Sequence, residues 1–123
     1  MRSIKIVIVD CQSIIREGLS VLLDKQRGMK IIGQVGSIRD ACDIVSKTRP
    51  DVILMNLNIG LNPSVHHIEE ISSCSPASKV LVLTGILDEE ANRMAAQRGA
   101  MGVVLKDQAA STLVTAIRKV SEG

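Results

Sequence analysis

Short apolar runs alternate with amphipathic segments along the whole chain. Each run is four to six mostly aliphatic residues long, which is typical of a strand, and the segment after it carries apolar residues at helical spacing. The pattern occurs five times. We predict strands at 4–9, 30–35, 52–57, 79–83 and 102–105, and helices at about 13–25, from 38 onward, at 65–73, at 89–98 and at 111–121.

Five strand–helix units of this length indicate an α/β fold. Parallel strands need long crossover connections, and helices supply them on both faces of the sheet. Right-handed crossovers restrict the topologies, and we predict a doubly wound five-stranded parallel sheet of flavodoxin-like order 2-1-3-4-5. No internal linker or repeat interrupts the pattern, so residues 1–123 are expected to form one domain.

Polar residues and glycines predict where several of these elements begin and end. Ser13 is expected to be the N-cap of the first helix. Ser37 with Asp40 resembles a capping box at the start of the second helix. Asp88 is expected to cap the fourth helix, and Gly99 to follow its last turn. The same reasoning places Cys42 in a helix core and Cys74 in a loop.

Composition excludes several classes of function. Lys and Arg number 15 against 13 Asp and Glu, and this net charge of +2 provides no basic field for DNA. Phe, Tyr and Trp are absent, so no aromatic side chain is available to stack on bases. The first residues lack a secretory h-region, and no apolar run approaches membrane-span length. Three cysteines without metal-type spacing favour a reducing compartment. We therefore expect a cytoplasmic domain that does not contact a membrane.

Four predicted strands end on a single polar residue: Asp10, Asn56, Thr84 and Lys106. In a doubly wound sheet, ligands bind outside the carboxyl ends of the strands, where such residues converge. Any one of them could be ordinary loop chemistry or a helix cap. Four together predict a polar site at this edge of the sheet.

Several segments in order carry a family resemblance: IVIVDCQSIIREGLSVLL, PDVILMNLNIG, VLVLTG, RGAMGVVLKD and AIRKVSEG. The chain resembles, from end to end, a receiver domain of a two-component response regulator, and specifically the NarL/FixJ/LuxR-type subgroup. The resemblance implies a phosphorelay in which a histidine kinase phosphorylates an aspartate beside Mg²⁺. It also implies that a C-terminal helix-turn-helix DNA-binding domain follows residue 123 in the full-length protein, and that DNA is bound only through that domain.

This sequence departs from the family pattern at its most important positions. The resemblance assigns the first acid to Asp10, and the two groups that contact phosphoryl oxygens to Thr84 and Lys106. The phosphoacceptor position holds Asn56, and the second acidic position holds Cys11. Two other positions also differ: Gly60 replaces the usual proline, and Val103 replaces the aromatic residue that changes rotamer on activation.

These departures remove the chemistry of phosphorylation. An amide nitrogen is delocalised and cannot form the acyl phosphate that a carboxylate forms. Mg²⁺ prefers hard oxygen ligands, and a thiol is soft. The vestigial metal positions would be Asp10, Cys11 and the Asn58 backbone, and we predict that Mg²⁺ binding is lost and that no cofactor replaces it. Instead, Asp10, Asn56, Thr84 and Lys106 are expected to form a closed polar network, in which Asn56 donates to Asp10.

The leading hypothesis is a pseudo-receiver: a non-enzymatic regulatory and dimerisation module of a transcription regulator. It would form a homodimer and respond to a histidine kinase or another regulatory protein.

Two alternatives remain open. The domain could accept a phosphoryl group with Mg²⁺, through another residue or as an engineered Asp→Asn form of a working receiver. It could also be a stand-alone protein-interaction domain. Cys11, Gly60 and Val103 favour natural divergence over engineering. Cys11 could fill a vacated ligand position or act as a redox sensor.

Overall fold

A computed structural model of the chain describes residues 3–56, 65–84, 89–105 and 110–122. Its strands form one parallel sheet in the order β2-β1-β3-β4-β5, which confirms the predicted fold class and strand order. The strands are β1 (Ile4–Val9), β2 (Met29–Val35), β3 (Val52–Asn56), β4 (Lys79–Thr84) and β5 (Ala100–Leu105).

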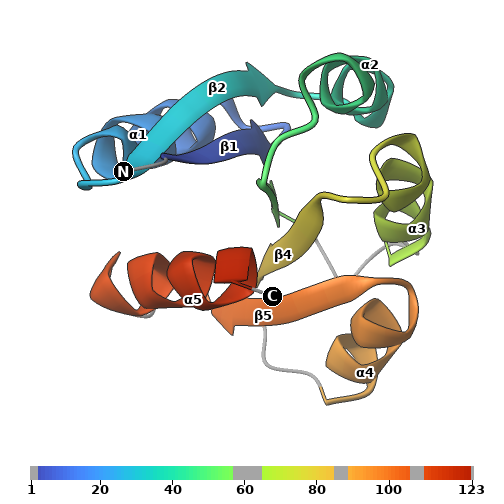
Figure 1. Cartoon of the computed structure of the whole chain (residues 1–123). Helices are drawn as coiled ribbons and strands as arrows, with labels where there is room; N and C mark the ends of the chain where they lie inside the picture. The colour runs from blue at the N-terminus through green and yellow to red at the C-terminus, as the bar shows by residue number, and fades with distance from the viewer. Residues whose placement is uncertain (1–2, 57–64, 85–88, 106–109, 123) are drawn as a thin grey trace.

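Helices cover both faces of this sheet (Figure 1). They are α1 (Ser13–Asp24), α2 (Ile38–Thr48), α3 (Val65–Cys74), α4 (Glu89–Gln97) and α5 (Ala110–Glu122). The first and last helices pack on one face, and the other three pack on the opposite face. None of the helices in the described ranges is both long and apolar enough to cross a membrane.

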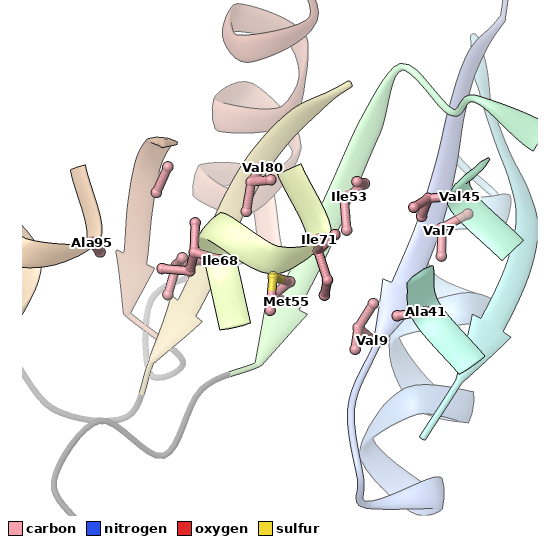
Figure 2. Close-up of a cluster of buried hydrophobic side chains, with 12 residues drawn as sticks. Val7, Val9, Ala41, Val45, Ile53, Met55, Ile68, Ile71, Val80 and Ala95 are labelled. Atoms are coloured by element: carbon pink, nitrogen blue, oxygen red, sulfur yellow. The ribbon is translucent and has the colours of Figure 1, made fainter. Parts of the chain in front are cut away.

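The alternation of side chains along each strand builds two separate cores. In β3, Val52 and Leu54 point toward α1 and α5, whereas Ile53 and Met55 point toward α2 and α3, and all four are essentially inaccessible to solvent. Figure 2 shows the second of these cores, which is built from aliphatic side chains. Because β3 is buried on both faces, it reads in the sequence as a continuous apolar run.

Two strands begin earlier than the sequence pattern predicts. Met29 pairs with Ile4, so β2 starts one residue before the expected 30. Ala100 pairs with Val80 ahead of a register shift, so β5 starts two residues before the expected 102. In both cases, pairing with the neighbouring strand extends the strand beyond the residues that the sequence pattern assigned to it.

The predicted helix boundaries are partly right. The Ser37 side chain accepts a hydrogen bond from the Asp40 backbone N–H at 3.1 Å, which confirms the predicted cap of α2. The expected cap at Ser13 is wrong: Gln12 occupies the N-cap position of α1, without a capping side-chain bond, and Ser13 is already helical. The expected loop position of Cys74 is also wrong, because Cys74 is the last residue of α3. Gly99 follows α4 with φ of 114°, as expected of a glycine after a helix. Asp88 lies outside the described residues.

Candidate functional site

The carboxyl ends of β1, β3 and β4 bring three of the predicted site residues to one edge of the sheet. Asp10 directly follows β1, Asn56 is the last residue of β3, and Thr84 is the last residue of β4. Asp10 and Thr84 are each only 1% exposed, and Asn56 is partly buried. Buried polar groups need partners, so the contacts of these side chains define what the site can do.

Both carboxylate oxygens of Asp10 accept hydrogen bonds from the chain itself. The side-chain amide of Asn56 donates to Oδ2 at 2.7 Å, and the backbone N–H of Gln12 donates to Oδ1 at 2.9 Å. The predicted bond from Asn56 to Asp10 is therefore confirmed. The backbone of Asp10 is held as well, since its N–H donates to the Val35 carbonyl at 3.0 Å.

The contact with Asp10 determines the orientation of the Asn56 amide. Rotating the amide by half a turn would place its oxygen against a carboxylate oxygen, where neither atom has a proton to donate. In the observed orientation Oδ1 is buried and has no hydrogen-bond partner among the residues that the structure describes. An unsatisfied buried acceptor costs roughly 1–3 kcal/mol. The amide therefore bonds to Asp10 through Nδ2, while its Oδ1 is left without a partner among the described residues.

Arg16 is a neighbour of this site that the sequence reasoning did not select. Its guanidinium donates to the Asp10 backbone carbonyl at 2.6 Å. Gly36 makes room for it, because a Cβ at that position would lie 3.0 Å from Arg16 Nη1. The sequence offered one signal for Arg16, which is its position in the first turn of a helix that begins shortly after the end of a strand. The positively charged guanidinium of Arg16 thus contacts the main-chain carbonyl of the buried Asp10.

The remaining predicted site residues are not all brought together. Cys11 is exposed, with a free thiol. Val103 lies in β5, where it is partly buried and packs against the core shown in Figure 2. Lys106, Asn58 and Gly60 lie outside the described residues, so the predicted contact between Asp10 and Lys106 stays a prediction. Within the described part of the chain, no cluster of three or more His, Cys, Asp or Glu side chains could hold a metal ion.

Comparison with known proteins gives the class to which this fold and strand-tip site belong. The response regulator receiver domain family matches residues 6–118. The chain is 35% identical over 120 residues to the transcriptional regulatory protein LnrK of Bacillus subtilis, covering 98% of this chain and 54% of that protein. It is 31% identical over 121 residues to the response regulator protein VraR of Staphylococcus epidermidis, covering 98% of this chain and 58% of that protein.

Solved structures have the same architecture. The signal receiver domain of the response regulator NarL from Mycobacterium tuberculosis superposes with a TM-score of 0.89 at 21% identity, covering 100% of this chain and 99% of that one. A LuxR-family two-component response regulator from Aurantimonas sp. gives a TM-score of 0.89 at 25% identity, covering 98% of this chain and 86% of that one.

The fold and the strand-tip site define a receiver-like α/β domain. The chain belongs to the response regulator receiver domain family, and its similarities are of the NarL/LuxR type. It spans about half the length of the curated relatives that it matches.

Proposed function

We propose that this chain is a pseudo-receiver, a receiver domain that regulates without phosphorylation at the usual strand-tip position. It would act as a non-enzymatic module of a transcription regulator. The observation that carries the proposal is the bond from the Asn56 amide to Asp10 Oδ2 at 2.7 Å. An amide stands where the family resemblance places a nucleophilic carboxylate, and it is bonded to the acid that would otherwise help to hold Mg²⁺.

The described residues do not fit a Mg²⁺ site of the receiver type. Mg²⁺ keeps near-octahedral oxygen coordination and is usually held by one or two carboxylates together with waters. Each oxygen of Asp10 already accepts an N–H, from Asn56 and from Gln12. Cys11, at the second acidic position, offers a soft sulfur instead of a hard oxygen. The Asn56 amide would therefore compete with a cation for Asp10 Oδ2.

The chemistry of Asn56 supports the same proposal. Its neutral amide has little nucleophilic character, so it cannot capture a phosphoryl group as an acyl phosphate. Asp10 cannot substitute for it, because that side chain is 1% exposed and both of its oxygens are engaged. We infer that any signal reaches this domain by another route, such as a partner protein or self-association.

The relatives suggest what the rest of the protein does. LnrK is named a transcriptional regulatory protein, and a structural neighbour from Staphylococcus aureus is described as a DNA-binding response regulator of the LuxR family. We propose that a DNA-binding domain follows this chain in the full-length protein. We also propose that the domain forms a homodimer, which would place two such DNA-binding domains on a symmetric site.

Incubation with acetyl phosphate and Mg²⁺, followed by intact-protein mass spectrometry, tests the proposal. The wild-type chain is expected to gain no phosphoryl group. A double variant, Cys11→Asp with Asn56→Asp, restores the two missing acidic positions of the family pattern and serves as the positive control. A phosphoryl group on the wild-type chain would overturn the proposal and favour the Mg²⁺-dependent alternative, and peptide mapping would then locate the acceptor.

Sedimentation at increasing protein concentration tests the dimer separately. The expected result is a concentration-dependent monomer–dimer equilibrium that does not change when beryllofluoride and Mg²⁺ are added. A shift of that equilibrium with beryllofluoride would show that the strand-tip site still binds a phosphoryl analogue. A monomer at every concentration would refute the dimer and leave the proposal about phosphorylation standing.

A further inference from the structure

Two cysteines lie near each other where α2 meets α3. Cys42 lies in the second turn of α2 and Cys74 is the last residue of α3, and both are free thiols of intermediate burial. These helices lie side by side on the same face of the sheet (Figure 1). Both side chains pack against the same aliphatic core, the one that contains Ala41 and Ile71. The packing of two helices thus brings together two thiols that are far apart in the sequence.

The backbone of α3 shows how near the two sulfurs are. Cys42 Sγ lies 4.0 Å from the Glu70 carbonyl oxygen. In an α-helix this carbonyl accepts the N–H of the residue four positions later, which is Cys74. The Cα–Cβ bond tilts toward the helix N-terminus, so the Cys74 side chain lies over the turn that contains Glu70. Cys42 therefore reaches the turn that Cys74 covers, close enough for the Cys74 side chain to contribute to the raised pKa of Cys42.

The third cysteine provides an internal comparison. Cys42 is 31 residues from Cys11 and 32 residues from Cys74. Loop-closure entropy depends only weakly on length, so an unfolded chain has almost no preference between these two partners. In the folded chain Cys11 is exposed at the strand-tip edge, after β1, whereas Cys74 is beside Cys42. A preference for Cys74 would therefore be a property of the fold.

We propose that Cys42 and Cys74 form a reversible disulfide, an oxidative modification site that links α2 to α3. The oxidant is a hydroperoxide, with hydrogen peroxide as the simplest member of the class. On α2, a hollow lined by Arg39, Asp40, Cys42 and Asp43 lies beside Cys42. The site is independent of the phosphoacceptor position and of whether the domain can be phosphorylated.

The environment assigns different roles to the two sulfurs. Burial, with further contributions from Cys74 and Glu70, raises the pKa of Cys42 to about 12, so Cys42 is a neutral thiol near neutral pH. The thiolate is the nucleophile toward peroxide, so the neutral Cys42 thiol is disfavoured as the attacking group and we assign the first attack to Cys74. Its sulfur bonds to one peroxide oxygen, the O–O bond breaks, and hydroxide leaves, which gives a sulfenic acid on Cys74.

The second step closes the bridge. The Cys42 sulfur attacks the Cys74 sulfenic sulfur, the S–O bond breaks, and the Cys42 thiol proton passes to the departing hydroxide to form water. The two thiols together lose two electrons and two protons, and one peroxide becomes two waters. Because the attacking Cys42 starts as a neutral thiol, this step is expected to limit the rate. A dithiol reductant reverses the bridge by thiol–disulfide exchange.

Peptide mapping after peroxide treatment of the folded chain tests the proposal. The expected product is a monomer with a Cys42–Cys74 linked peptide, a loss of two of its three free thiols, and full reversal by dithiothreitol. The same treatment in concentrated urea is the matched control, and it should give Cys11–Cys42 and Cys42–Cys74 links in similar amounts. Cys11→Ser should leave the folded result unchanged, whereas Cys42→Ser and Cys74→Ser should each abolish the link.

Other outcomes would overturn the proposal. One is a folded chain in which Cys74 proceeds to sulfinic acid without any link to Cys42. Another is a folded chain whose links are distributed as they are in urea. Both results come from the wild-type sequence, so they hold even where a serine variant fails to fold.

Discussion

Replacing Asn56 by aspartate is expected to destabilise the domain strongly at neutral pH. The substitution keeps the shape of the side chain but replaces its donor, Nδ2, with an oxygen. That atom lies 2.7 Å from Asp10 Oδ2, at a position where both groups are at least partly buried. The variant therefore loses a hydrogen bond to a charged acceptor and places two carboxylates in contact.

The structure sets limits on the size of the effect. A hydrogen bond to a charged group contributes about 1.5–3 kcal/mol. Two unit charges that relax to about 4 Å repel each other by about 4 kcal/mol at an effective dielectric constant of about 20. Protonation of one carboxyl group would relieve this repulsion. With an aspartate pKa of about 3.9, protonation costs about 4 kcal/mol at pH 7 but only about 1.5 kcal/mol at pH 5.

Urea unfolding at these two pH values measures the effect. We expect Asn56→Asp to lose roughly 3–4 kcal/mol of unfolding free energy at pH 7 and no more than about 1.5 kcal/mol at pH 5. The sign follows from linkage: a carboxyl whose pKa is raised in the folded state favours folding at low pH, and this advantage disappears as the pH rises. The loss should therefore shrink on acidification.

The exchanged pair is the matched control. Asp10→Asn combined with Asn56→Asp reverses the direction of the bond and again pairs one amide with one carboxylate. It should recover most of the stability that the single variant loses. The reasoning is refuted if Asn56→Asp is within about 0.5 kcal/mol of the wild type at pH 7. It is equally refuted if the exchanged pair is no more stable than the single variant.

Four further predictions concern local packing and protonation. A Cβ on Gly33 would lie 2.3 Å from Ile44 Cδ1, so the end of the Ile44 side chain has to move; Gly33→Ala should cost roughly 0.5–1.5 kcal/mol in urea unfolding, and Ile44→Val, which removes that methyl, should restore most of it. Gly18 has no atom near its Cβ position, and Gly18→Ala should be neutral or stabilising by up to about 1 kcal/mol in the same assay. Arg49 ends α2 with φ of 47°, so Arg49→Gly should raise the unfolding free energy by roughly 0.5–1 kcal/mol, whereas Arg49→Ala, which keeps the strained φ, should not. Because the pKa of Cys42 is raised from 9.0 to about 12, its alkylation by iodoacetamide should rise steeply between these pH values, and the folded state should lose the corresponding stability over the same range.

The hydrophobic pattern predicted the sheet because the two periodicities of this chain are distinct. The strand from Val52 is buried on both faces and reads as an unbroken apolar run, whereas the helices carry apolar residues every three to four positions. Neighbouring parallel strands place their carboxyl ends together, so the contact between Asp10 and Asn56 could also be anticipated.

Other features depend on how elements pack, and a sequence pattern does not contain that information. The meeting of Cys42 with Cys74 requires the axial positions of α2 and α3 on the sheet, which periodicity does not determine. The start of α1 at Ser13, with Gln12 as its N-cap, depends on the turn in which the Gln12 N–H bonds to Asp10. The hydrogen bond from Arg16 to the Asp10 carbonyl depends on the same turn.

The aliphatic composition makes this domain almost silent in fluorescence and near-ultraviolet spectroscopy. Without a Phe, Tyr or Trp residue, it lacks intrinsic fluorescence and any aromatic near-ultraviolet signal. A single tryptophan introduced at Val103, which is partly buried and packs against the core shown in Figure 2, would be the only aromatic fluorophore in residues 1–123. Every change in emission on oxidation, partner binding or self-association could then be assigned to the surroundings of one side chain in β5.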